Sequence, residues 1–173
     1  MSIVPPTGIL RLVWEQAVYE GEDKSEAFWQ VFLHFAFGEL DEYAVTSEPP
    51  PEPLPWRLDT VVRRYNADFD IVSILVRVEC PQPDRNLGEV EKQALDAANM
   101  YMDLYHLSHA YVVTTRELTF RTWIVREGDH TLRPLYGMAV RGDESQYIAV
   151  NSPDAYRLTD AIQIMKEVEK TIN

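Results

Sequence analysis

The chain has 173 residues, enough for one domain with a substantial core, and its 46% apolar and 25% charged residues are typical of globular proteins. Its formal net charge of −12 gives no long-range attraction to nucleic acid, but it does not exclude a local basic patch on the surface. Cys80 is the only cysteine, so no disulfide forms within the chain, and we predict an intracellular location, cytoplasmic or nuclear.

The N-terminal part predicts two helices. Apolar residues recur at helical spacing over residues 9–20, and we treat residues 1–22 as a helical extension of a single domain, 1–173. Ser25 is a suitable N-cap for a second helix, residues 26–37, whose stripe is expected in the core. The stripe consists of Phe28, Val31, Phe32 and Phe35. The most apolar run of this region is too short to span a bilayer, so no membrane partner is expected.

A strand, a proline-rich loop and a hairpin follow. Residues 42–48 predict the strand, and five prolines within residues 49–55 predict a stiff loop, which acts as a spacer or as a polyproline ligand. Residues 57–65 and 71–80 are rich in β-branched side chains and are joined by a turn sequence, which predicts a hairpin. Its second strand is nearly continuously apolar, as in strands covered on both faces.

The C-terminal half predicts a long helix over residues 85–107, several strands and a final helix. The strands are expected at residues 110–115, 119–125, 132–137 and 146–150. Ser152 is a suitable N-cap for the final helix. This helix should bury Leu158, Ile162 and Met165, with Ala161, Ile164 and Val168 beside them. The order of elements predicts an α/β domain with a mixed central sheet flanked by helices.

The register of the hairpin decides whether two acidic side chains lie side by side. If its turn is centred on Phe69, Asp59 lies opposite Glu79 and Val61 lies opposite Arg77. Opposed side chains share one face of the sheet, so two carboxylates there need a cation between them. Either Mg²⁺ or an arginine, Arg77 or Arg57, would meet that need. A register shifted by one residue would separate the two acids.

The same residues resemble the PD-(D/E)XK restriction-endonuclease-like superfamily. Its motif places one acid on the first hairpin strand and (D/E)-x-K at the end of the second, which "LDTVV" with Asp59 and "VRVECP" with Glu79 resemble. The later strands and "YIAVNSPDAYRLTDAIQIMK" resemble a fungal group of this superfamily. The resemblance implies a restriction-endonuclease-like core and magnesium held by the two acids. It also implies supporting roles for Glu26 on the early helix and for Gln93 on the helix after the hairpin.

The chain departs from this motif where the family has its lysine. That position is Pro81, which carries no charge and no hydrogen-bond donor. Lys92 on the following helix is the nearest lysine that could replace it; otherwise it is a solvated helix residue. The candidate catalytic residues are therefore Asp59, Glu79 and Lys92, with Arg77 as a supporting residue.

Three functions remain open at this point. The first is a pseudoenzyme, a nuclease-fold protein that keeps its acids, has lost the motif lysine and acts by binding a protein or a nucleic acid. The second is an active Mg²⁺-dependent hydrolase of DNA or RNA that uses Asp59 and Glu79 with Lys92. The third is a protein-interaction module that uses the proline-rich loop or an apolar surface.

Overall fold

A computed structural model of the chain describes residues 1–20, 22–47, 60–80 and 86–168. Its centre is a mixed sheet in which β1 to β6 follow one another in chain order and β7 pairs with β5. The strands are β1 (Tyr43–Thr46), β2 (Thr60–Tyr65), β3 (Ile71–Glu79), β4 (His109–Arg116), β5 (Thr119–Arg126), β6 (Arg133–Pro134) and β7 (Ile148–Ala149). The helices are α1 (Ile9–Glu20), α2 (Glu22–Ala36), α3 (Leu87–Tyr105) and α4 (Tyr156–Val168). This confirms the predicted α/β class with a mixed central sheet.

The strand directions follow from the connections between the strands. The β1–β2, β2–β3 and β4–β5 pairs are antiparallel, whereas β3 and β4 are parallel. A parallel pair needs a crossover connection, and α3 supplies it between β3 and β4. Asn86 begins α3 as its N-cap, with its side chain accepting a hydrogen bond from the Gly88 amide at 2.8 Å.

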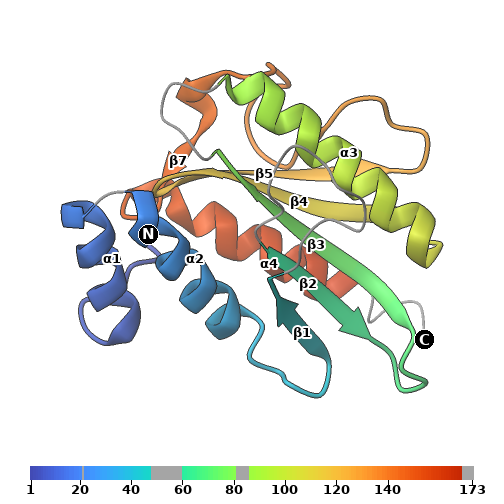
Figure 1. The fold of residues 1–173 in the computed structure, drawn as a ribbon, viewed down its shortest axis with the longest axis horizontal. Helices are drawn as coiled ribbons and strands as arrows, with labels where there is room; N and C mark the ends of the chain where they lie inside the picture. Colours follow the sequence, from blue (N-terminus) through green and yellow to red (C-terminus); the bar gives the residue numbers. More distant parts are fainter. Residues whose placement is uncertain (21, 48–59, 81–85, 169–173) are drawn as a thin grey trace.

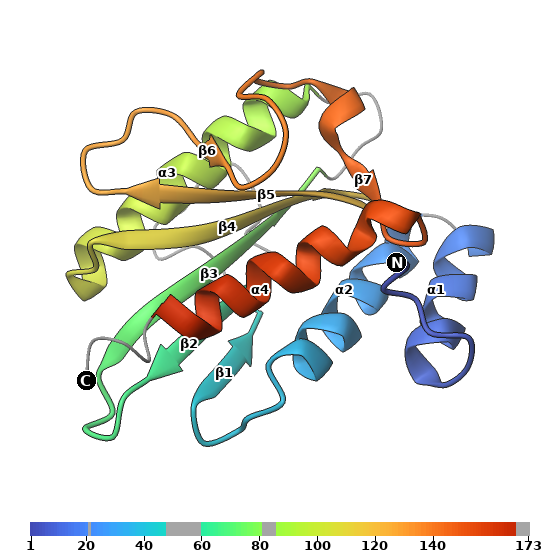
Figure 2. The same ribbon diagram turned by 180° about the vertical axis from the view of Figure 1, so that it is seen from behind.

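Helices cover both faces of the sheet. Helices α1, α2 and α4 lie on one face and α3 lies on the other, as the opposite views in Figures 1 and 2 show. Alternate residues of β3 divide between these faces: Leu75 joins the core under α2 and α4, while Val76 and Val78 join the core under α3. None of the helices in the described ranges is long and apolar enough to cross a membrane.

The second helix begins earlier than predicted and buries a different face. It starts at Glu22, so Ser25 lies inside it and is not its N-cap. Phe28 and Phe32 are buried as expected, but Phe35 is 64% exposed. The buried face is centred nearer to Trp29, which places Phe35 at its edge.

The predicted hairpin register is wrong by one residue. Arg77 pairs with Thr60, and Val61 pairs with Val76, whereas the expected partner of Arg77 was Val61. An irregularity between Arg64 and Tyr65 shifts the register next to the turn. Both the proline-rich loop, residues 49–55, and Asp59 lie outside the described residues.

The C-terminal strands are shorter than predicted. Only Arg133–Pro134 and Ile148–Ala149 are strands, because Pro134 lacks an amide donor and Gly137 and Gly142 adopt positive φ angles between them. Ser152 precedes a 3₁₀ turn, Pro153–Ala155, and α4 follows it. Leu158, Ile162, Met165 and Ala161 of α4 are buried as predicted, while Ile164 is exposed.

Candidate functional site

A group of polar side chains gathers between α2 and the carboxyl ends of β3 and β4. We call it the Arg77 cluster, and it consists of Ser25, Glu26, Gln30, Arg77, Glu79 and Thr115. Arg77 and Glu79 are two residues apart on β3 and therefore share one face of the sheet. Glu26 and Gln30 are four residues apart on α2 and share one face of that helix.

Arg77 is the centre of the cluster and is fully buried, with 0% of its surface exposed. Its Nη2 forms an ion pair with the Glu26 carboxylate and lies 3.8 Å from Oε2 of Glu79. Its Nη1 donates a hydrogen bond to Oγ1 of Thr115 at 3.2 Å, and its guanidinium carbon lies 5.9 Å from the centre of the Trp29 ring. One arginine therefore joins α2, β3 and β4.

Each oxygen of the two carboxylates has a partner within the protein. Oε1 of Glu26 accepts a hydrogen bond from Gln30 at 2.8 Å, and its Oε2 faces Arg77. Oε1 of Glu79 accepts a hydrogen bond from Ser25 at 2.8 Å, and its Oε2 is within ion-pair distance of Arg77. The carboxylates are therefore satisfied by side chains alone.

The described part of this cluster does not fit a divalent cation. A guanidinium is permanently charged and already lies between the carboxylates of Glu26 and Glu79, where it would repel a metal ion. Among the described residues, no group of three or more histidine, cysteine or acidic side chains is arranged to hold a metal. The observed register pairs Thr60 with Arg77, so it does not support the expected pairing of Asp59 with Glu79. Asp59 itself lies outside the described residues, and a magnesium ion there stays a prediction.

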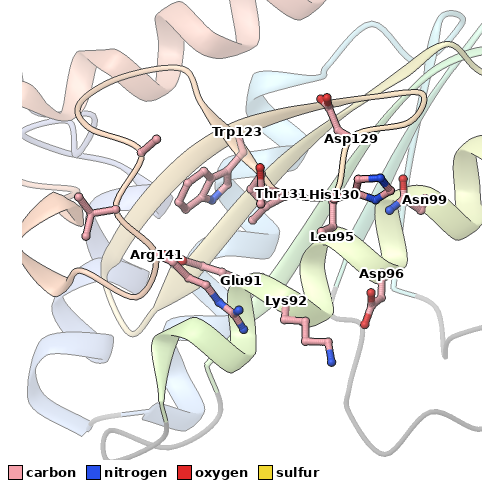
Figure 3. Close-up of a pocket in the computed structure, with 13 residues that line it drawn as sticks. Glu91, Lys92, Leu95, Asp96, Asn99, Trp123, Asp129, His130, Thr131 and Arg141 are labelled. Atoms are coloured by element: carbon pink, nitrogen blue, oxygen red, sulfur yellow. The ribbon is translucent and has the colours of Figure 1, made fainter.

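The remaining candidate residues lie elsewhere. Lys92 is exposed on α3 and lines a pocket beside Glu91 and Trp123, which Figure 3 shows. Since α3 and α2 cover opposite faces of the sheet, the structure does not bring Lys92 to Glu79, which contacts α2. Gln93 is half-buried on α3 and does not line that pocket. Pro81 lies outside the described residues.

A second buried charged group, which the sequence did not reveal, lies on the α3 face. Oε1 of Glu91 accepts a hydrogen bond from Nη1 of Arg121 at 3.3 Å and another from the Tyr147 hydroxyl at 3.3 Å. Oε2 of Glu91 accepts one from the Gly142 amide at 2.7 Å. Burial raises the pKa of Glu91 above its ordinary value, although the Gly142 amide and Arg121 act in the opposite direction. Burial also raises the pKa of Tyr147.

One sequence signal could have indicated this second group. Glu91 follows Leu87 by four residues and precedes Ala94 by three, so it lies on the buried side of α3. A carboxylate on that side needs a buried cation, and Arg121 alternates with apolar residues on β5.

Comparison of the chain with protein families, with curated proteins and with solved structures found no match.

Proposed function

We propose that the chain is a nuclease-fold protein that no longer hydrolyses nucleic acid and acts by binding. The observation that carries this proposal is the position of Arg77, whose guanidinium lies between the carboxylates of Glu26 and Glu79. In the family that the sequence resembles, acids at these places would serve a magnesium ion. Here a side chain of the protein itself supplies the positive charge.

The order of elements supports the first half of the proposal. Helix α2, strand β1, the β2–β3 hairpin, helix α3 and strand β4 follow one another in the order that the resemblance implies. Glu79 is the last residue of the second hairpin strand, and Glu26 lies on the helix before the sheet. These positions support the proposal, since the resemblance assigns Glu79 to the acid of (D/E)-x-K and Glu26 to an additional acid that some members carry.

Electrostatics supports the loss of catalysis. Two unit charges of the same sign repel by about 4 kcal/mol at 4 Å in a partly buried site, and a divalent ion would double that cost beside Arg77. The position two residues after Glu79 is Pro81, which cannot replace the lysine that orients the attacking water in the family. The net charge of −12 favours a protein partner over nucleic acid.

A cleavage assay tests the proposal. The native protein would be incubated with labelled single- and double-stranded DNA and RNA in Mg²⁺ or Mn²⁺, beside Asp59→Ala and Glu79→Ala variants. We expect the native protein to cleave no faster than the two variants. Cleavage by the native protein that either variant abolishes would overturn the proposal and favour an active nuclease.

A further inference from the structure

The face of the sheet opposite the Arg77 cluster carries a pocket between α3 and residues 129–141. Its volume is about 410 Å³, within the range of pockets that bury small organic ligands. Figure 3 shows Trp123 at its centre, with side chains of α3 on one side and the loop residues on the other. The apolar part of its lining consists of Leu95, Trp123, Leu132, Ala139 and Val140.

The loop wall of this pocket is held in place by buried charges. Arg121 donates hydrogen bonds to the carbonyl oxygens of Met138 and, at 2.8 Å, Val140. Glu91, only 3% exposed, accepts from the Gly142 amide at 2.7 Å and pairs with Arg121. Because both ends of the 138–142 segment are tied to this ion pair, the pocket is formed before any ligand arrives.

Positive charge collects at one end of the pocket. The Arg141 guanidinium donates to the carbonyl oxygen of Gly88 through Nε at 2.9 Å and Nη2 at 2.7 Å, which fixes its position. Lys92 follows Gly88 by one helical turn, and Figure 3 shows its side chain extending outward from α3 at the rim of the pocket. Neither cation has a carboxylate within ion-pair distance among the described residues, although the chain is strongly acidic.

Most of the negative charge on the lining is already neutralised. Glu91 pairs with Arg121, and Asp129 pairs with Arg133. Asp96 is the remaining acid, one turn beyond Lys92, where Figure 3 shows it further along α3 from Arg141. The pocket is thus positive at the Arg141 end, apolar in its middle and polar at the Asp96 end.

We propose that this pocket binds a small organic anion with an apolar, aromatic body. The anionic group lies against Arg141 and Lys92, and the body lies against the apolar lining around Trp123. This site is on the other face of the sheet from Glu79. Ligand binding in the pocket therefore does not depend on whether the protein has lost nuclease activity.

Two matched dyes test the proposal. One is 8-anilinonaphthalene-1-sulfonate, an aromatic anion, and the other is N-phenyl-1-naphthylamine, which lacks the sulfonate. We expect saturable binding of the sulfonate dye by fluorescence. An Arg141→Gln, Lys92→Gln double variant should weaken that binding about tenfold and leave the neutral dye unchanged. Arg126→Gln, an exposed arginine that does not line the pocket, is the control and should change neither dye.

A second variant locates the dye. Ala139→Trp fills the pocket from its exposed loop wall, so it should abolish binding of the sulfonate dye while circular dichroism stays native. If the sulfonate dye does not bind, or if Ala139→Trp leaves its binding intact, the pocket is not the site. If the double variant weakens both dyes equally, the assignment of an anion is wrong.

Discussion

Arg77 is a residue whose burial needs an explanation. Removing a charged side chain from water costs several kcal/mol unless opposite charges and hydrogen bonds offset the cost. Glu26, Glu79 and Thr115 provide that offset, and the edge of the cluster at Glu26 remains partly open to solvent. Arg77 is therefore a counter-ion on which two carboxylates depend.

Removing this counter-ion should destabilise the protein. We expect Arg77→Met to lower the free energy of unfolding by about 3 kcal/mol, because it leaves two carboxylates without their cation. Urea denaturation at neutral pH measures the change. Arg126→Met, which removes an exposed arginine, should change the stability by less than about 0.5 kcal/mol.

A further variant separates lost charge pairing from lost packing. Adding Glu26→Gln and Glu79→Gln to Arg77→Met removes the carboxylates that Arg77 served, so much of the stability should return. If the triple variant is less stable than Arg77→Met alone, Arg77 is not acting as a counter-ion.

Glu91 gives a prediction about pH. Because burial raises its pKa in the folded protein, the folded state binds the proton more tightly than the unfolded chain does. The resulting stability is complete below the ordinary value of 4.5 and is lost as the pH rises through the raised pKa. We expect the stability of the native protein, measured relative to Glu91→Gln, to fall as the pH rises above 4.5. A relative stability that rises with pH would contradict this.

At the scale of elements, the hairpin turn determines where the hairpin side chains lie. Oδ1 of Asn66 accepts hydrogen bonds from the amides of Asp68 and Asp70, both at 2.9 Å. Phe69 is 84% exposed and has a φ of 64°, a left-handed conformation that side chains with a Cβ disfavour.

Relieving this conformation should stabilise the hairpin. We expect Phe69→Gly to raise the free energy of unfolding by about 0.5–1 kcal/mol, since glycine adopts a positive φ without steric cost and little buried surface is lost. Phe69→Ala keeps a Cβ and should give no such gain. Thermal unfolding of the two variants checks this, and equal midpoints would show that the conformation of Phe69 carries no strain.

Elements were predictable where local patterns are strong. Helix α3 and strands β3, β4 and β5 lie within one or two residues of the expected ranges, because their periodicity and β-branched runs are long. The register of the hairpin was not predicted correctly, because Tyr65 pairs with Ile71 and the turn is therefore centred on Asp68 instead of Phe69. The irregularity beside Tyr65 then moves the pairing by one residue and removes only part of this difference. The role of Ser25 was missed for a related reason, since its partner Glu79 is 54 residues away.

At the scale of the whole molecule, the sheet separates two buried groups of charges. The Arg77 cluster joins α2 to β3 and β4, and the Glu91–Arg121 pair joins α3 to β5 and to the 138–142 segment. The resemblance to a known family indicated the acids Glu26 and Glu79, whereas it gave no role to Arg121. The two faces can therefore be tested separately, one for metal binding at the Arg77 cluster and one for ligand binding in the pocket.

The most direct test of the proposal that Arg77 replaces a metal ion is calorimetry with Mn²⁺. We expect no saturable heat when Mn²⁺ is added to the native protein, because Arg77 holds Glu26 and Glu79. Arg77→Met, which frees the two carboxylates, should bind Mn²⁺ weakly, and adding Glu79→Gln should remove that binding. Saturable binding of Mn²⁺ by the native protein, lost in Glu79→Gln, would contradict the central claim that a side chain has taken the place of the metal.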